Sequence, residues 1–387
     1  MKNTGTSTWT LASGYKLGFQ NPQDNTIWGY GNRVNLNAGE MIKPGQQKTF
    51  YFNVKAPASP GNYNFALRMV REGVEWFGAF TPNAVVQVRG NVASLENLLN
   101  GKAQFITDQQ VVPLQGPNLG HREAFAVNRP DLGPNTILLY HRCFVIDAGH
   151  PEIAVARSDD GGASFGPSKR IITLLAGYFS VTPSVLKLGN TWWMVYEEGA
   201  LGACYASSPD GLSWTRRGRV FPDSEGASTP SLYEYNGTIY VFYAWFQPNS
   251  DKHLTIRYRK GLSLTNLGGG YDLFSPAQSG WGTKSVSMPR IVRQVETNGR
   301  VAHYMFFEGA TDNLFCSNEN NNKYGWGVAR SYDLVHWNAC GGNPIMINKG
   351  GCGLDMPNPF ISDGGSVFVF HTSANLKYIM REQLRLR

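Results

Sequence analysis

A repeated hairpin is the feature of this sequence that most restricts its fold. Four segments begin at an X-Pro pair and continue as two apolar runs, clearest in TPSVLKLGNTWWMVYEEG (182–199) and TPSLYEYNGTIYVFYAWF (229–246). The turn between the runs is Gly-Asn or Asn-Gly, which tolerates a positive φ and is typical of β-hairpins. The four starts are Thr182-Pro183, Thr229-Pro230, Met288-Pro289 and Met356-Pro357, and a looser fifth copy begins at His121. Repeats of this length predict a five-bladed β-propeller over residues 119–387.

Composition excludes several functional classes. The 387 residues carry a net charge of +7, but the basic residues are scattered, with no basic stripe and no reader motif for nucleic acid. No apolar stretch is long enough to cross a membrane, and the polar start Met1-Lys2-Asn3-Thr4 is no signal peptide. We therefore expect a protein that does not bind nucleic acid or span a membrane, and that is a monomer.

Residues 1–89 have a different pattern. Short alternating segments at 48–54, 63–70 and 84–88 are separated by Pro-Gly and Gly-rich turns. This spacing predicts a small β-sandwich, so the whole chain is expected to be all-β. Residues 90–118 lose the alternation and are expected to be a linker. Within it, SLENLLNGK predicts one short helix with Ser94 as N-cap and Asn97 at the third helical position.

The first region also resembles a known domain. NTGTSTWTLASGYKLG, NPQDNTIWG and KPGQQKTFYFNVKAPASPGNYNFALRMVREGVEWFG are similar to the four-tryptophan immunoglobulin-like domain, with Trp9, Trp28 and Trp76 in hallmark positions and Leu67 in the fourth. That domain occurs in an autophagy receptor family and, in bacteria, beside secreted enzymes. The resemblance therefore implies a bacterial protein that is secreted or at the cell surface. The alternative to a recognition role is that the three tryptophans fill or roof the sandwich core.

Polar residues gather where the repeated strands begin and end. The start of one hairpin strand lies beside the end of its partner, so these residues should meet at one face of the propeller channel. Polar groups that end apolar strands indicate a polar cavity, because they are costly to bury without partners. The candidate catalytic residues are Glu123, Glu198, Glu308 and Asp355, and the candidate sugar-binding residues are Arg122, His141, Arg142, Trp245, Arg290 and His371.

Paired carboxylates suit the cleavage of glycosidic bonds, since one protonated acid serves the leaving oxygen and one carboxylate serves as base or nucleophile. The alternative is that these glutamates form a buried ionic network with Arg122, Arg142 or Arg290. By contrast, Asp160, Asp210 and Asp333 each follow a serine and precede an aromatic residue. We expect these aspartates to cap tight turns as structural residues.

The turns and proline-marked strands together resemble the five-bladed propeller glycoside hydrolases of the family 43, 32 and 62 group, and the first turn resembles a sialidase Asp-box. In the family 43 pattern, Asp-Pro opens the first and third blades and a Glu opens the fourth. This chain has Arg122-Glu123-Ala124, Thr229-Pro230 and Met288-Pro289 there. His371 resembles the fifth-blade histidine that approaches a channel metal, so a structural metal ion is left open while no other cofactor is expected.

Three functions follow from these observations. The first is a glycoside hydrolase acting on a poly- or oligosaccharide, with the β-sandwich as an accessory domain. The second is a non-catalytic carbohydrate-binding propeller. The third is an adhesion or interaction protein whose sandwich binds a protein partner.

Overall fold

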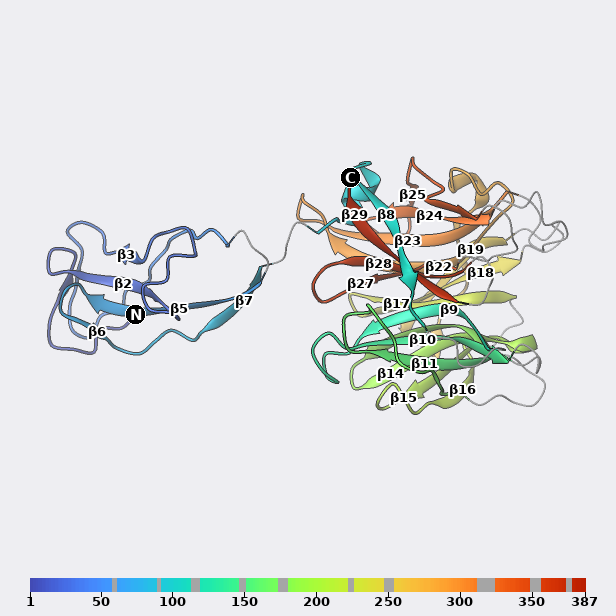
Figure 1. The fold of residues 1–387 in the computed structure, drawn as a ribbon, viewed down its shortest axis with the longest axis horizontal. Helices are drawn as coiled ribbons and strands as arrows, with labels where there is room; N and C mark the ends of the chain where they lie inside the picture. The colour runs from blue at the N-terminus through green and yellow to red at the C-terminus, as the bar shows by residue number, and fades with distance from the viewer. Residues whose placement is uncertain are drawn as a thin grey trace. The chain divides into compact units, whose positions relative to one another are not determined.

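The computed structural model describes residues 1–57, 61–88, 92–112, 119–145, 151–172, 180–221, 226–246, 254–311, 324–348, 356–373 and 378–387. The chain divides into two compact units, Met1–Val92 and Ala93–Arg387. Both are built almost entirely of β-strands (Figure 1). In the described part of the chain, no helix is long and apolar enough to cross a membrane.

The first unit is a small β-structure around one core. Its larger sheet has the order β3-β2-β5-β6, with β7 also paired to β5, and β1 pairs with β4. The strands are β1 (Trp9–Thr10), β2 (Tyr15–Gln20), β3 (Arg33–Asn35), β4 (Met41–Ile42), β5 (Gly61–Arg71), β6 (Glu75–Phe77) and β7 (Ala84–Val88). Trp9 and Trp28 lie in its core. Trp76 covers Gly18, where a Cβ would lie 2.3 Å from the indole, and the Arg33 guanidinium is 4.7 Å from the Trp76 ring centroid. The tryptophans thus fill or roof the core.

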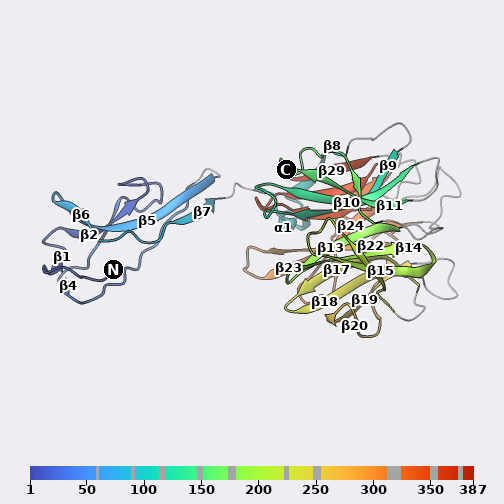
Figure 2. The same ribbon diagram turned by 90° about the horizontal axis from the view of Figure 1, so that it is seen from below.

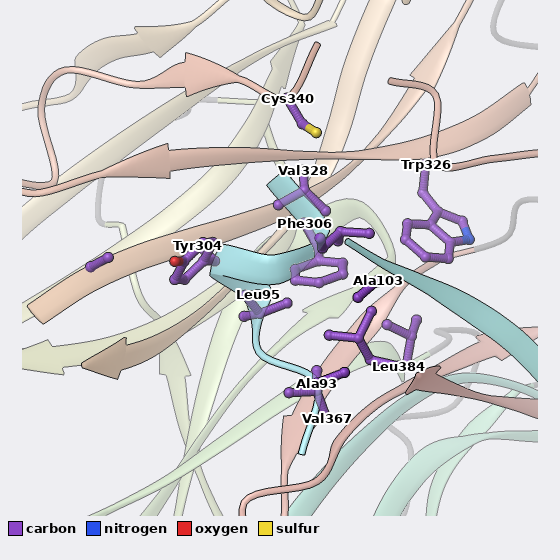
Figure 3. Close-up of a cluster of buried hydrophobic side chains, with 13 residues drawn as sticks. Ala93, Leu95, Ala103, Tyr304, Phe306, Trp326, Val328, Cys340, Val367 and Leu384 are labelled. Atoms are coloured by element: carbon purple, nitrogen blue, oxygen red, sulfur yellow. The ribbon is translucent and has the colours of Figure 1, made fainter. Parts of the chain in front are cut away.

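The second unit begins with helix α1 (Leu95–Leu99). Ser94 and Asn97 form the reciprocal capping box that the sequence indicated. Figure 3 shows Leu95 packed among Tyr304, Phe306 and other buried side chains of the last sheets. The segment 90–118, expected as a linker, differs from that expectation because it also supplies strand β8 (Ala103–Gln110), which pairs with the C-terminal strand. A linker pattern and an edge strand of a distant sheet are hard to separate in sequence, since the pairing partner lies far along the chain.

Five antiparallel sheets, counted over the described residues, make up the rest of the unit, and we number them I to V. Sheet I contains β9 (Leu119–Asn128), β10 (Ile137–Val145), β11 (Glu152–Ser158) and β12 (Lys169–Arg170); sheet II contains β13 (Ser180–Leu188), β14 (Thr191–Glu198), β15 (Gly202–Ser208) and β16 (Thr215–Arg219). Sheet III contains β17 (Ala227–Tyr235), β18 (Thr238–Phe246), β19 (Leu254–Ser263), β20 (Asn266–Leu267) and β21 (Tyr271–Phe274); sheet IV contains β22 (Ser285–Val295), β23 (Val301–Ala310), β24 (Tyr324–Ser331), β25 (Asn338–Ala339) and β26 (Met346–Asn348). Sheet V contains β27 (Asn358–Ile361), β28 (Val367–Thr372), β29 (Ile379–Leu386) and β8.

The first strands of the sheets form a closed circle. β9 contacts β13, β13 contacts β17, β17 contacts β22, β22 contacts β27, and β27 contacts β9 again. Figure 2 shows how β18, β19 and β20 follow β17 outward to the edge of the unit. The pairing of β8 with β29 ties the beginning of the unit to its end (Figure 1). This arrangement places the first strands around a common axis.

Each first strand is distorted at the same place. The residue before the proline, or Glu123 in sheet I, has a positive φ: 56° at Glu123, 54° at Thr182, 51° at Thr229, 53° at Met288 and 42° at Met356. The pairing register shifts beside this residue in sheets I to IV. A positive φ is unfavourable for residues other than glycine, so the surrounding contacts must hold the backbone in this conformation.

The three Ser-Asp turns are structural. Oδ1 of Asp160, Asp210 and Asp333 each accepts two backbone N–H groups of its own turn, at 2.7–3.0 Å. Burial opposes the charge of Asp160, but the bonds from Ser164, Ser158 and Ala163 outweigh it and lower the pKa of Asp160 to about 2. These aspartates are occupied by their turns, as the sequence pattern indicated.

Candidate functional site

Glu123 is held at the centre of the circle of first strands. Its side chain is 3% exposed, and Nη1 of Arg142 donates to its Oε1 at 2.8 Å. The backbone N–H of Thr182, on the neighbouring sheet, donates to Oε2 at 2.7 Å. Both carboxylate oxygens of Glu123 therefore have partners, one a cation of its own sheet and one a backbone group of the next sheet.

The bond to Thr182 is one of a series that joins neighbouring sheets. In each case the N–H of the positive-φ residue donates to a side-chain oxygen of the preceding sheet. The bonds are Thr182 N to Glu123 Oε2 (2.7 Å), Thr229 N to Glu197 Oε2 (3.0 Å), Met288 N to Thr229 Oγ1 (3.4 Å) and Glu123 N to Thr372 Oγ1 (3.3 Å). The bulge thus turns an N–H toward the neighbouring sheet, where a buried donor needs an acceptor.

Glu197 is a second carboxylate at this site. Its Oε2 accepts from the Thr229 N–H and from Oγ of Ser228 at 2.9 Å. Burial raises the pKa of Glu197, and the negative charge of Glu123 adds to the rise, while Thr229, Ser228 and Arg142 act in the opposite direction. Glu197 directly precedes Glu198, which the sequence pattern indicated as a candidate acid.

Glu198, the selected neighbour, faces elsewhere. It is 2% exposed, accepts a 3.0 Å hydrogen bond from the hydroxyl of Tyr196 and forms an ion pair with Arg216 of β16. Consecutive strand residues point to opposite faces, so Glu197 and Glu198 cannot both face the next sheet. The hydrogen bonds from Ser228 and Thr229 show that Glu197 does, and Glu197 lies opposite Val181 just before the bulge. Ser287 and Glu308 have that same relation in sheet IV.

Glu308 is therefore the counterpart of Glu197 two sheets away. It is 2% exposed and lies between Ser287 and Trp326 in the register of its neighbours. The next residue, Gly309, lies under Trp281, since a Cβ there would be 2.8 Å from Cζ2 of the indole. Trp281 was not singled out in the sequence. Asp355, the remaining candidate acid, lies outside the described residues.

Two arginines stand beside Glu123. Arg122 and Arg142 are opposite each other in the register of β9 and β10. Burial lowers the pKa of Arg122 to about 10, and the charge of Arg142 lowers it further while Glu123 raises it. The side chain of Arg142 keeps 25% exposure. Both guanidinium groups can thus donate hydrogen bonds to oxygen atoms of a ligand that binds beside Glu123.

Arg290, on the first strand of sheet IV, bonds to the first strands of two other sheets. It is 5% exposed, and its Nη1 donates to the carbonyl of Pro230 at 2.8 Å. Nη2 donates more weakly to the carbonyls of Thr182 and Pro183, at 3.5 and 3.4 Å. The Arg290 guanidinium therefore links the first strands of sheets II, III and IV, so this candidate sugar-binding residue has a structural position.

The histidines and the tryptophan of the predicted site are packed inside the sheets. His141 and His371 are buried, with Nε2 bonded to Oγ of Ser168 at 2.8 Å and to Oε1 of Glu382 at 3.2 Å, respectively. Burial lowers the pKa of His141 to about 3. Trp245 is partly buried, and the Arg257 guanidinium lies 4.5 Å from its ring centroid. These residues follow the strand alternation to the face opposite Arg142 and Glu197.

The described residues contain no group of three or more His, Cys, Asp and Glu side chains that could hold a metal ion. The free thiols Cys143, Cys204 and Cys340 are buried, and Cys316 and Cys352 lie outside the described residues.

The fold of the second unit is similar to that of solved glycoside hydrolases. No family model and no curated protein matches the sequence. Among solved structures, a thermostable family-43 glycoside hydrolase is 15% identical, with a TM-score of 0.53 over 71% of this chain and 92% of that one. An endo-arabinase from Bacteroides thetaiotaomicron is 13% identical, with a TM-score of 0.52 over 72% and 98%. The second unit has the propeller fold of glycoside hydrolases. At these identities the likeness shows the fold alone.

Proposed function

We propose that the second unit is a five-bladed β-propeller, each of sheets I to V being one blade, that cleaves a glycosidic bond in a poly- or oligosaccharide at the strand starts. Glu197 is the proton donor to the leaving oxygen. Glu123 is the carboxylate that activates water or attacks the sugar, and Arg122 and Arg142 contact the bound sugar. The first unit is an immunoglobulin-like accessory domain of a secreted or cell-surface protein.

One observation carries this proposal. Glu123 and Glu197 come from adjacent sheets and interact electrostatically, yet their surroundings differ. Arg142 pairs with Glu123, whereas hydrogen-bond donors without charge hold Glu197. The raised pKa of Glu197 fits the proton donor in acid–base cleavage of a glycoside, and a second carboxylate on the adjacent sheet fits the base or nucleophile. Glu308 has the same register position as Glu197 and is the second choice for the acid.

A second function is favoured by a different observation. Both carboxylates accept backbone N–H groups of the next sheet, as the hydroxyl of Thr372 does. In that function the glutamates are structural, and the residues at the strand starts bind a glycan without cleaving it.

The two functions are separated by assaying release of reducing ends from a panel of plant and microbial oligosaccharides, alongside binding by affinity electrophoresis. Hydrolysis predicts turnover that Glu197→Gln and Glu123→Gln abolish and that Glu198→Gln, the matched control on the opposite face, leaves in place. Binding that persists in all three variants without any turnover would instead establish the non-catalytic function. Equal turnover in all variants would remove both glutamates from the mechanism.

A further inference from the structure

A separate cavity lies at the other end of the first strands. Its volume is about 280 Å³, and all of its lining belongs to β9, β13, β22 and β27. The strand starts carry Glu123, whereas this cavity is lined by the later residues of the same strands. It is formed by Phe125, Ala126, Val127, Asn128, Val185, Leu186, Arg290, Ile291, Val292, Arg293, Asn358, Pro359, Phe360 and Ile361.

Arg290 is the buried charge in this lining. Its bonds to described residues all go to backbone carbonyls, through Nη1 and Nη2, and Nε makes none. Its guanidinium carbon is 5.7 Å from the ring centroid of Phe125, which lines the same cavity. A guanidinium whose neighbours are carbonyl dipoles has no full negative charge in direct contact, so it can still bind an anion.

The charge balance of the cavity is one-sided. Among the described residues, the charged side chains that line it are those of Arg290 and Arg293, and no aspartate or glutamate does. Glu123 raises the pKa of Arg290 from a distance, but burial dominates and lowers it to about 10. Both oxygens of Glu123 are already bonded to Arg142 and Thr182. A negative group in the cavity would therefore meet a field in which the positive charges of Arg290 and Arg293 dominate.

The remaining walls are mostly apolar. Three apolar lining residues each lie two positions after another lining residue, and so on the same face of their strand: Val127 after Phe125, Val292 after Arg290 and Phe360 after Asn358. Leu186 of β13 is a fourth apolar lining residue. A buried cation at one side and apolar walls around it suit a ligand with both properties. We propose that this cavity binds a small organic carboxylate, its carboxylate against Arg290 and its apolar body against Val127, Leu186, Val292 and Phe360. This site is independent of the glycan site.

Calorimetric titration of the full chain with benzoate tests the proposal, with benzyl alcohol as the uncharged analogue and inorganic phosphate as the anion without an apolar body. Because a hydrogen bond to a charged group outweighs a neutral one, benzoate should bind about tenfold or more tightly than benzyl alcohol. Phosphate should bind more weakly than benzoate. Benzyl alcohol equal to benzoate, or phosphate as tight as benzoate, would overturn the proposal.

Variants place the binding in the cavity. Arg290→Met should abolish benzoate binding, and Arg219→Gln, which removes an exposed charge on β16, should leave it unchanged. Since Arg290 also links three sheets, a second variant keeps the test valid if Arg290→Met does not fold. Leu186→Trp retains Arg290 and fills the cavity, so it should reduce benzoate affinity at least about tenfold. Benzoate affinity that is unchanged in Leu186→Trp locates the binding elsewhere and contradicts the proposal.

Discussion

The backbone N–H of Thr182 donates a 2.7 Å hydrogen bond to Oε2 of Glu123, across the boundary between two sheets. The same bulge that gives Thr182 its positive φ points this N–H at the neighbouring sheet. The glutamate therefore satisfies a buried donor while Arg142 balances its charge. Structure and candidate chemistry meet in one carboxylate, and the predictions below separate the two roles.

Replacing Glu197 should change the pH profile and the dependence on the leaving group. If Glu197 donates a proton, Glu197→Gln should lower kcat/KM by about 10²–10⁴-fold on natural glycosides. Wild-type activity should fall as the pH rises through the raised pKa of Glu197, and the Glu197→Gln variant should not show this fall. For a 2,4-dinitrophenyl glycoside, whose leaving group needs no proton, kcat/KM of wild type and Glu197→Gln should differ by a much smaller factor. An equal loss on both substrates would argue against proton donation.

Removing the charge of Glu123 should destabilise the second unit. Glu123→Gln keeps an acceptor for Thr182 but leaves Arg142 without its anion, at a cost of about 2 kcal/mol in the free energy of unfolding. Glu123→Ala removes both bonds and should cost about 4 kcal/mol. The control is Glu152→Gln, whose partner Arg170 is 57% exposed, so less than about 1 kcal/mol is expected. Urea unfolding measures all three, and equal costs for Glu123→Gln and Glu152→Gln would contradict the buried pair.

Acid should destabilise the protein through its buried histidines. Burial lowers the pKa of His121 to about 4, of His141 to about 3 and of His303 to about 4, against 6.5 for an ordinary histidine. Each binds its proton more readily when unfolded, so its stabilisation is complete above pH 6.5 and is lost as the pH falls toward 4.

Each of these histidines should contribute about 1.4 kcal/mol of lost stability per pH unit in that window. Unfolding in urea between pH 7 and 5 measures the slope. His121→Phe preserves a ring beside His141, whose ring centroid is 4.9 Å away. It should reduce the slope by the amount that corresponds to about one fewer proton taken up on unfolding. A slope that is the same in His121→Phe and wild type would show that His121 does not contribute.

The positive φ of Thr182 should make glycine more stabilising than alanine at this position, which is the reverse of their usual order in a strand. In the interior of a strand, a protein with alanine is normally more stable than one with glycine by about 0.5–1 kcal/mol. At Thr182, with φ of 54°, Thr182→Gly should instead be more stable than Thr182→Ala by about 1 kcal/mol, because a Cβ is strained in that region. Ser180, two residues earlier on β13, provides the control pair, for which alanine should be the more stable. Chemical denaturation of the four variants decides, and the same order at both positions would mean that the bulge carries no strain.

Local sequence was sufficient for the central hairpins, the helix cap and the Ser-Asp turns. The Asn-Gly and Gly-Asn turns and the alternating runs predicted the hairpins β13–β14 and β17–β18, and Ser94 with Asn97 predicted the helix cap. It was also sufficient for the turn role of Asp160, Asp210 and Asp333, because each acceptor and its donors lie within a few residues. Such features depend on contacts close in the chain, which the order of residues expresses directly.

The choice between Glu197 and Glu198 depended on the tertiary structure. Both end the same strand, and only the register beside the bulge decides which one faces the next sheet. Strand alternation likewise buries His141 and His371 between the sheets. It also directs Arg290 toward the backbone carbonyls of two other sheets. The sequence determined which polar residues stand at the strand ends. Only packing between sheets decided which way each one points, since strand alternation turns neighbouring side chains to opposite faces.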